Sequence, residues 1–158
     1  MTVTLVLGGA RSGKSGVAER RAGPGPVTYV ATARVADMPE RVAAHRARRP
    51  PEWTTVETQD LPRALSEASG TVLVESLTAW VAAATDFSVD TDALCRALAG
   101  HDGDVVVVSD EVGLGVHPST EAGRLFRDAL GLVNQAVAAV ADDVLLVVAG
   151  RALPLDRI

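Results

Sequence analysis

The feature that most constrains the fold is a glycine-rich octapeptide near the N-terminus. Residues 8–15 read GGARSGKS and match the pattern G-x-x-x-x-G-K-[ST], which forms a phosphate-binding loop between a buried strand and a helix. The flanks fit, because the apolar run 3–7 precedes the octapeptide and a helix-like stretch, 14–22, follows it. Its glycines let backbone N–H groups converge on a phosphate, and a plain glycine turn is the alternative. The predicted nucleotide contacts are Gly8, Gly9, Ala10, Arg11, Ser12, Gly13, Lys14 and Ser15.

The chain contains a single lysine, Lys14, against fourteen arginines. A general preference for arginine codons explains why arginines outnumber lysines. It does not explain why position 14 keeps a lysine. A compact ammonium on a flexible stem suits a phosphate loop, and a planar guanidinium does not. We therefore expect Lys14 to act in catalysis on the β- and γ-phosphate oxygens, and the Ser15 hydroxyl to bind Mg²⁺.

Apolar runs alternate with helix-like stretches along the chain. Continuous Val and Leu runs, without polar alternation, are typical of strands buried on both faces of a parallel sheet. The pattern predicts one doubly wound α/β domain over residues 1–158, with Asp90 and Thr91 at a helix start. The expected strands are 3–7, 27–31, 53–57 (an edge strand), 71–74, 105–108 and 144–149, and the expected helices are 14–22, 39–48, 61–68, 76–84, 91–99 and 121–141.

Composition argues against several classes of protein. The net charge of −5 disfavours a dedicated nucleic-acid binder, which normally has a basic balance. No apolar segment reaches the roughly 18–20 residues of a membrane span. The single cysteine, Cys95, has no partner for an intramolecular disulfide and fits a reducing compartment. We therefore expect a cytoplasmic protein without nucleic-acid or membrane partners.

Acidic residues follow two of the expected strands. Glu75 ends the run 71–75, and Asp110 and Glu111 end the run 105–111. In open parallel sheets, ligands bind outside the carboxyl ends of the strands, so all three acids are candidates to hold Mg²⁺ or its waters. A helix N-cap is the alternative role for each of them.

His45 lies on the expected helix 39–48 and is followed by Arg46, Arg48 and Arg49. By pattern alone, a surface helix with solvated arginines is the simpler interpretation. The functional alternative is a nucleophile, because nearby arginines lower the pKa of a histidine and keep its imidazole neutral. The same arginines could neutralise triphosphate oxygens.

The other two histidines give weaker signals. His101 lies between Gly100 and Asp102, and we expect it to be exposed in a turn. His117 precedes Pro118 in the loop after Glu111, where it could line a site.

Several blocks of sequence together resemble one family, the bifunctional adenosylcobinamide kinase / adenosylcobinamide-phosphate guanylyltransferases of cobalamin biosynthesis. The phosphate loop alone would fit many families, but its combination with His45 and the segments 53–57 and 111–115 is specific. The matching blocks are 8–15, 29–33, 41–45, 53–57, 74–78, 111–115, 126–128, 134–135 and 147–150, in order over nearly the full chain.

This resemblance implies a P-loop NTPase fold with a RecA-like, mostly parallel sheet and flanking helices. It implies phosphorylation of adenosylcobinamide with ATP or GTP, then transfer of GMP from GTP through a GMP-histidine at His45, giving adenosylcobinamide-GDP. Mg²⁺ as cofactor and a homotrimer are also implied. Further implied nucleotide contacts are Ala31, Thr32, Ala33, Arg46, Ala47, Arg48, Arg49, Glu57 and Glu75.

Two positions depart from the commonest pattern of the family. Members often have Asn where this chain has Asp110, and many have Asp where it has Glu75. Two other functions remain open from the residues alone. A simple P-loop kinase would use Lys14 and Ser15 but not His45, and a non-catalytic nucleotide switch would only order the loop 111–120 on binding.

Overall fold

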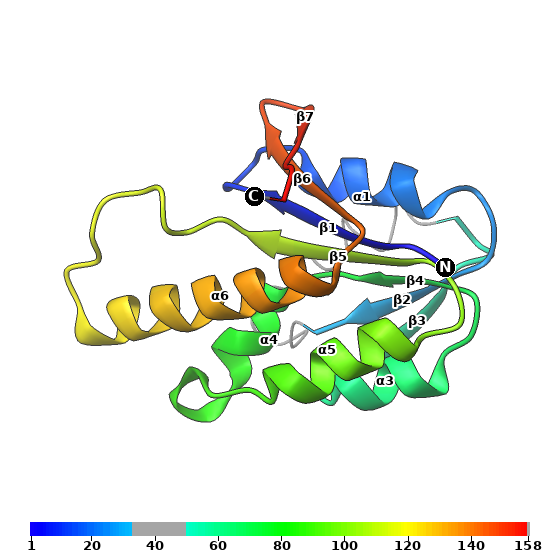
Figure 1. Cartoon of the computed structure of the whole chain (residues 1–158), viewed down its shortest axis with the longest axis horizontal. Coiled ribbons are helices and arrows are strands. Elements are labelled where there is room, and N and C mark those ends of the chain that lie inside the picture. The colour runs from blue at the N-terminus through cyan, green and yellow to red at the C-terminus, as the bar shows by residue number, and fades with distance from the viewer. Residues whose placement is uncertain (33–49, 158) are drawn as a thin grey trace.

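The computed structural model describes residues 1–32 and 50–157. Seven strands in these residues form one sheet in the order β3-β2-β4-β5-β1-β6-β7, parallel throughout except for the antiparallel pair β6–β7 (Figure 1). This arrangement confirms the predicted RecA-like α/β fold. The strands are β1 (Val3–Gly8), β2 (Val27–Ala31), β3 (Thr54–Glu57), β4 (Thr71–Val74), β5 (Val105–Asp110), β6 (Asp143–Val148) and β7 (Arg151–Pro154).

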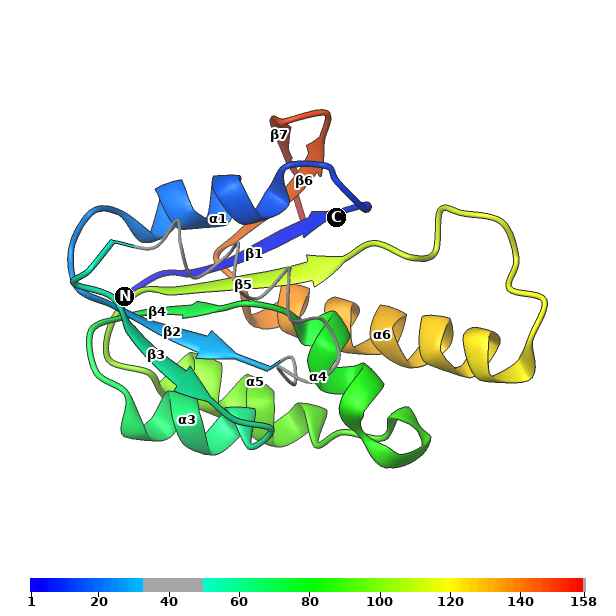
Figure 2. The same cartoon turned by 180° about the vertical axis from the view of Figure 1, so that it is seen from behind.

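Helices cover both faces of the sheet, as Figures 1 and 2 show. One face carries α1, and the other carries α3 to α6. Four helix N-termini are capped by the side chains of Asp60, Ser76, Asp90 and Thr120, as predicted for Asp90. The helices are α1 (Lys14–Ala22), α3 (Leu61–Glu67), α4 (Leu77–Ala83), α5 (Thr91–Gly100) and α6 (Glu121–Val140), with a 3₁₀ turn at Thr85–Phe87.

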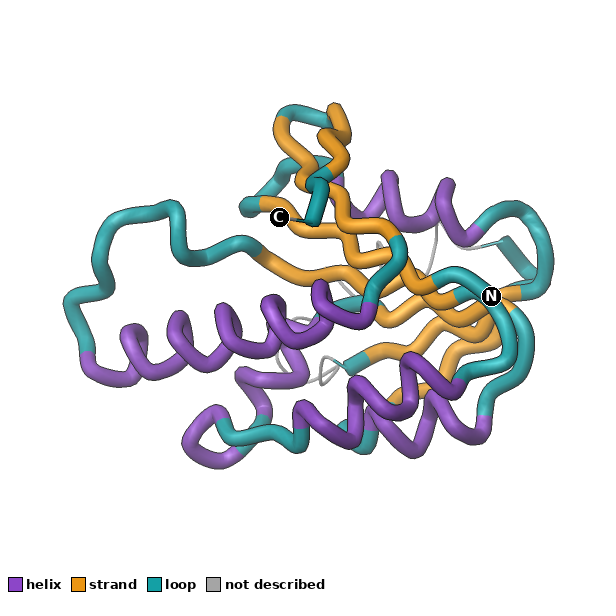
Figure 3. The backbone as a smooth tube through the Cα atoms, in the orientation of Figure 1, coloured by secondary structure: helices purple, strands orange, loops and turns teal. Residues whose placement is uncertain are grey.

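The sheet is buried between two apolar layers. All six residues of β1 and the first five of β5 are buried, which explains their continuous Val and Leu runs. The larger layer joins the sheet to leucines of α3–α6, and the smaller one joins it to α1. Figure 3 shows the strands running as one central layer between the helices. The parallel register of β1 and β5 places their carboxyl ends side by side.

The expected elements agree with the observed ones within about two residues at each end, with one strand missed. The predicted edge strand is β3, at one end of the sheet order. The antiparallel strand β7 was not expected from the sequence. The expected helix 39–48 lies outside the described residues. Within the described parts of the chain, no helix is long and apolar enough to cross a membrane.

Candidate active site

The octapeptide 8–15 forms the predicted loop between β1 and α1. The N–H of Ser12 donates to the carbonyl of Gly9 (3.2 Å), and the N–H of Gly150 donates to the carbonyl of Ser12 (2.7 Å), which ties the loop to the β6–β7 turn. Gly13 has a φ of 92°, a left-handed conformation that favours glycine. Such a turn at a helix N-terminus presents backbone N–H groups to an anion.

Gly8 occupies a position with no room for a side chain. A Cβ there would lie 2.5 Å from Ser12 Oγ and 2.8 Å from the carbonyl oxygen of Val147. The carbonyl belongs to β6, which pairs with β1, so it cannot withdraw easily. The first glycine of the motif is therefore required by close packing of the loop against the neighbouring strand.

Lys14 is buried at the first position of α1, and 7 % of the residue is exposed. Its ammonium lies 2.5 Å from Asp110 Oδ1 and donates to the carbonyl of Gly9 at 3.2 Å. The pair joins the phosphate loop to the end of β5. Asp110, one of the three candidate acids at strand ends, therefore contacts this lysine.

Asp110 is held in place through its backbone. It lies opposite Gly8 in the register of β1 and β5. Its N–H donates to Thr78 Oγ1 of α4 (2.9 Å), and its carbonyl accepts from Asn134 Nδ2 of α6 (3.1 Å). Thr78 and Asn134 lie in the matching blocks 74–78 and 134–135, but no role was predicted for either. The sequence did contain a sign of a role for Asn134, because it is a polar residue on the otherwise apolar stripe of α6. The structure shows that it is buried there.

The donors near the loop suit Mg²⁺. Ser15 follows Lys14 in α1, and Asp110, at the end of β5, contacts Lys14, so a residue with a hydroxyl and a residue with a carboxylate both adjoin the phosphate-loop lysine. Among residues 1–32 and 50–157, no group of three or more His, Cys, Asp or Glu side chains could hold a metal. This donor set fits Mg²⁺, which commonly uses one or two protein oxygens together with substrate phosphates and waters.

The other two acids lie at the same edge of the sheet. The N–H of Glu75, directly after β4, donates to the carbonyl of Val30 (3.0 Å). Glu111 directly follows β5, its N–H donates to the carbonyl of Gly8 (3.1 Å), and its Oε1 accepts from the N–H of Gly113 (2.6 Å). Both acids remain candidates for nucleotide or metal contact.

The ends of β2 and β3 bring further predicted contacts together. Ala31 lies opposite Glu57 in the β2–β3 register. Thr32 is fully buried, its Oγ1 donates to the carbonyl of Ser76 (2.6 Å), and its carbonyl accepts from Gln59 Nε2. These residues lie at the carboxyl edge of the sheet, where the loop 8–15 also lies. Outside the described residues are Ala33, His45, Arg46, Ala47, Arg48 and Arg49.

The prediction for His101 was wrong. The residue is buried, with 3 % exposed, and its ring nitrogens lie 3.1 Å from the carbonyl oxygen of Leu65 and 2.7 Å from that of Gly70. The ring connects α5 to α3 and to the residue before β4, so His101 is a structural residue. His117 is exposed, and its Nδ1 lies 2.8 Å from a guanidinium nitrogen of Arg127.

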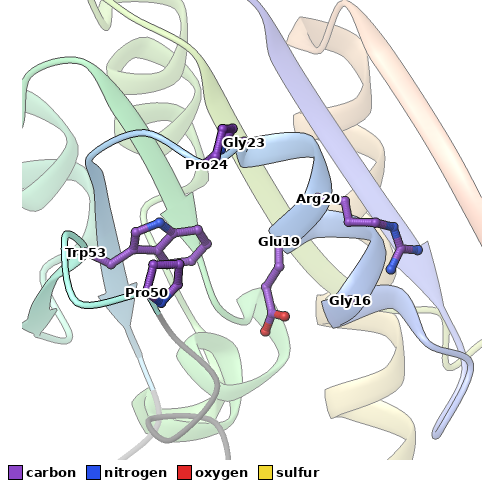
Figure 4. Close-up of a pocket in the computed structure, with 7 residues that line it drawn as sticks. All are labelled: Gly16, Glu19, Arg20, Gly23, Pro24, Pro50 and Trp53. Atoms are coloured by element: carbon purple, nitrogen blue, oxygen red, sulfur yellow. The ribbon is translucent and has the colours of Figure 1, made fainter.

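A cavity of about 580 Å³ lies along α1 rather than in the loop. In Figure 4, Glu19 lies on the side of α1 that faces Pro50 and Trp53, whereas Arg20 points away from them. Of the described site residues, none lines this cavity, although Gly16 directly follows Ser15. Its described lining consists of Gly16, Glu19, Arg20, Gly23, Pro24, Pro50 and Trp53.

The fold and the site define a P-loop nucleotide-binding protein. Residues 4–155 match the model of the family described as "Cobinamide kinase / cobinamide phosphate guanyltransferase", and the chain belongs to this family.

Relatives in three bacteria support the assignment. The "bifunctional adenosylcobalamin biosynthesis protein CobP" of Pseudomonas aeruginosa is 40% identical, over 96% of this chain and 95% of its own length. The CobU proteins of Salmonella typhimurium and Escherichia coli, with the same description, are 38% and 37% identical, each over 92% of this chain and 95% of their own length. Among solved structures, the P4 protein of bacteriophage phi6 with ADP matches with a TM-score of 0.44 and 18% identity, over 96% of this chain and 52% of that one.

Proposed function

We propose that the chain phosphorylates adenosylcobinamide with a nucleoside triphosphate and then transfers GMP from GTP to adenosylcobinamide phosphate. The observation that carries the proposal is the position of Lys14, the only lysine of the chain, buried in the phosphate loop at the carboxyl edge of the sheet. Membership of the family supplies the substrate class.

In the kinase step, positioning and charge stabilisation do most of the work. The loop 8–15 holds the β- and γ-phosphates through its backbone N–H groups, and Lys14 offsets charge on their oxygens. The substrate hydroxyl attacks the γ-phosphorus, and the bond to the β-phosphate oxygen breaks. The hydroxyl proton passes to solvent as the nucleoside diphosphate leaves. Bound Mg²⁺ would neutralise phosphate charge between Ser15 and Asp110, with Glu75 and Glu111 as further candidate ligands.

In the guanylyl step, His45 is the nucleophile. A neutral imidazole nitrogen attacks the α-phosphorus of GTP, and pyrophosphate leaves. The phosphate of adenosylcobinamide phosphate then attacks the same phosphorus and releases the imidazole, which gives adenosylcobinamide-GDP. Arg46, Arg48 and Arg49 neutralise triphosphate oxygens during the first displacement.

The remaining contacts and partners belong to the same proposal. We assign the nucleotide to the loop 8–15, to the segments 31–33 and 46–49, and to the acids Glu57 and Glu75. The opposition of Ala31 and Glu57 in adjacent strands supports a shared nucleotide site at this edge. We also propose that the protein acts as a homotrimer in the cytoplasm, with both ATP and GTP as substrates and no nucleic-acid partner.

The test is to incubate the protein with adenosylcobinamide and GTP labelled at either the α- or the γ-phosphate. The proposal predicts γ-label in adenosylcobinamide phosphate, and α-label in adenosylcobinamide-GDP. Transfer of γ-label alone would indicate a simple kinase. Nucleotide binding without either transfer would indicate a switch, and each of these two results would overturn the bifunctional assignment.

A further inference from the structure

The phosphate-binding lysine already has an anionic partner within the protein. Lys14 Nζ lies 2.5 Å from Asp110 Oδ1 and 3.2 Å from the carbonyl oxygen of Gly9. An ammonium has three donors, so two of them are directed at protein oxygens. A bound triphosphate needs the same ammonium for its own oxygens. Asp110 and the nucleotide therefore compete for one cation.

The backbone that carries this carboxylate is held in place next to Lys14. The backbone of Asp110 is bonded on both sides, through its N–H to Thr78 Oγ1 (2.9 Å) and through its carbonyl to Asn134 Nδ2 (3.1 Å). The next N–H, from Glu111, donates to the carbonyl of Gly8 (3.1 Å). Only rotation of its own side chain can move the carboxylate away. Phosphate oxygens entering the loop therefore approach a negative charge whose backbone the fold holds in place.

Burial reduces the screening of the attraction between Lys14 and Asp110, so a nucleotide must overcome it. The side chains of Lys14 and Asp110 are 9% and 25% exposed, so water and salt screen their attraction only in part. The chain contains a useful contrast in Arg21 and Asp143, whose side chains are 47% and 43% exposed. Exposed pairs of that kind contribute little. A nucleotide must therefore displace a shielded carboxylate from Lys14, not a solvated one.

We propose that Asp110 determines which form of the nucleotide this site accepts, favouring the magnesium complex over the metal-free triphosphate. With metal-free nucleotide, the carboxylate keeps Lys14 and repels the phosphates. When the nucleotide enters with Mg²⁺, Asp110 gains a second positive partner and releases the ammonium. The inference rests on the proposed nucleotide site, but it does not depend on the corrinoid acceptor or on His45.

The test is calorimetric titration of the full chain with the β,γ-imido analogue of GTP, once with Mg²⁺ and once with EDTA. In Asp110→Asn, metal-free binding should tighten about tenfold, since one charge-assisted hydrogen bond no longer holds the lysine. Binding of the magnesium complex should stay the same or weaken, so the preference for it collapses. The matched control is Asp143→Asn, which removes the same charge from an exposed pair and should change both affinities by less than about twofold.

Each outcome decides the matter. If Asp110→Asn and a second variant, Asp110→Ser, both bind metal-free analogue no more tightly than the wild type, the inference is overturned. The circular dichroism spectrum and a cooperative unfolding transition establish that the variants are folded. If the wild type binds neither form of the analogue, the proposed nucleotide site fails together with the inference. Normal wild-type binding without an Asp110 effect overturns the inference alone.

Discussion

Replacing His101 by alanine should destabilise the domain strongly, although the residue lies far from the phosphate loop in the sequence. His101 is buried, with 3% of the residue exposed, and its ring nitrogens contact the carbonyl oxygens of Leu65 (3.1 Å) and Gly70 (2.7 Å). Leu65 lies in the last turn of α3, where carbonyls lack partners within the helix. A neutral imidazole has one N–H, so the ring donates to one of these two carbonyls, and alanine would remove that hydrogen bond.

The magnitude follows from this hydrogen bond and from the space that the ring fills. A buried carbonyl left without a donor costs about 1–3 kcal/mol, and the cavity left by the ring adds to this. We expect a loss of about 2–4 kcal/mol, a large part of the roughly 5–15 kcal/mol that stabilises a domain. Urea unfolding at equilibrium, followed by circular dichroism, measures this difference.

The matched control is His117→Ala, because His117 is exposed and contacts Arg127 at the surface. We expect this variant to lie within about 0.5 kcal/mol of the wild type. A loss below about 1 kcal/mol for His101→Ala, with an unchanged slope of the unfolding curve, would refute the assigned role of the ring.

Three further predictions concern the loop and the cysteine. Lys14→Arg should reduce both phosphoryl and guanylyl transfer nearly as much as Lys14→Ala, because a guanidinium does not fit the loop; near-normal turnover would contradict the assignment. Gly8→Ala should weaken nucleotide binding at least about tenfold in titration calorimetry, because the new Cβ would lie 2.8 Å from the carbonyl oxygen of Val147. An unchanged affinity would contradict the close packing assigned to Gly8. Burial, and more weakly Asp92, raises the pKa of the Cys95 thiol, so its reaction with a disulfide reagent should be slower than that of a free thiol at neutral pH and should speed up as pH rises; equal rates would contradict this.

The main elements of the fold were predictable because burial on both faces leaves a direct trace in the sequence. The strands β1 and β5 read as unbroken apolar runs, and both are buried as expected. The strand β7 left no such trace, since its four residues are exposed. The turn between β6 and β7 was also hard to predict. Ala149 and Gly150 both have positive φ there, and alanine is not a usual residue at the first position of such a turn.

The site was predictable in its parts but not in its contacts. The octapeptide 8–15 defines its own local structure, so Lys14 could be identified from the sequence alone. Its pairing with Asp110 depends on β5 lying next to β1, an order that no local pattern encodes. The burial of His101 likewise depends on the carbonyls of Leu65 and Gly70, which the fold brings to it from another part of the chain.

The most direct test of the central claim is covalent labelling of purified wild-type protein and His45→Ala with GTP carrying a labelled α-phosphate. The wild type should accumulate protein-bound GMP that is labile to acid and stable to base, as expected for a phosphoramidate. His45→Ala should accumulate none, while it still phosphorylates adenosylcobinamide at a reduced rate, because that step needs no protein nucleophile. Protein-bound GMP forming in His45→Ala at the wild-type rate would contradict the account.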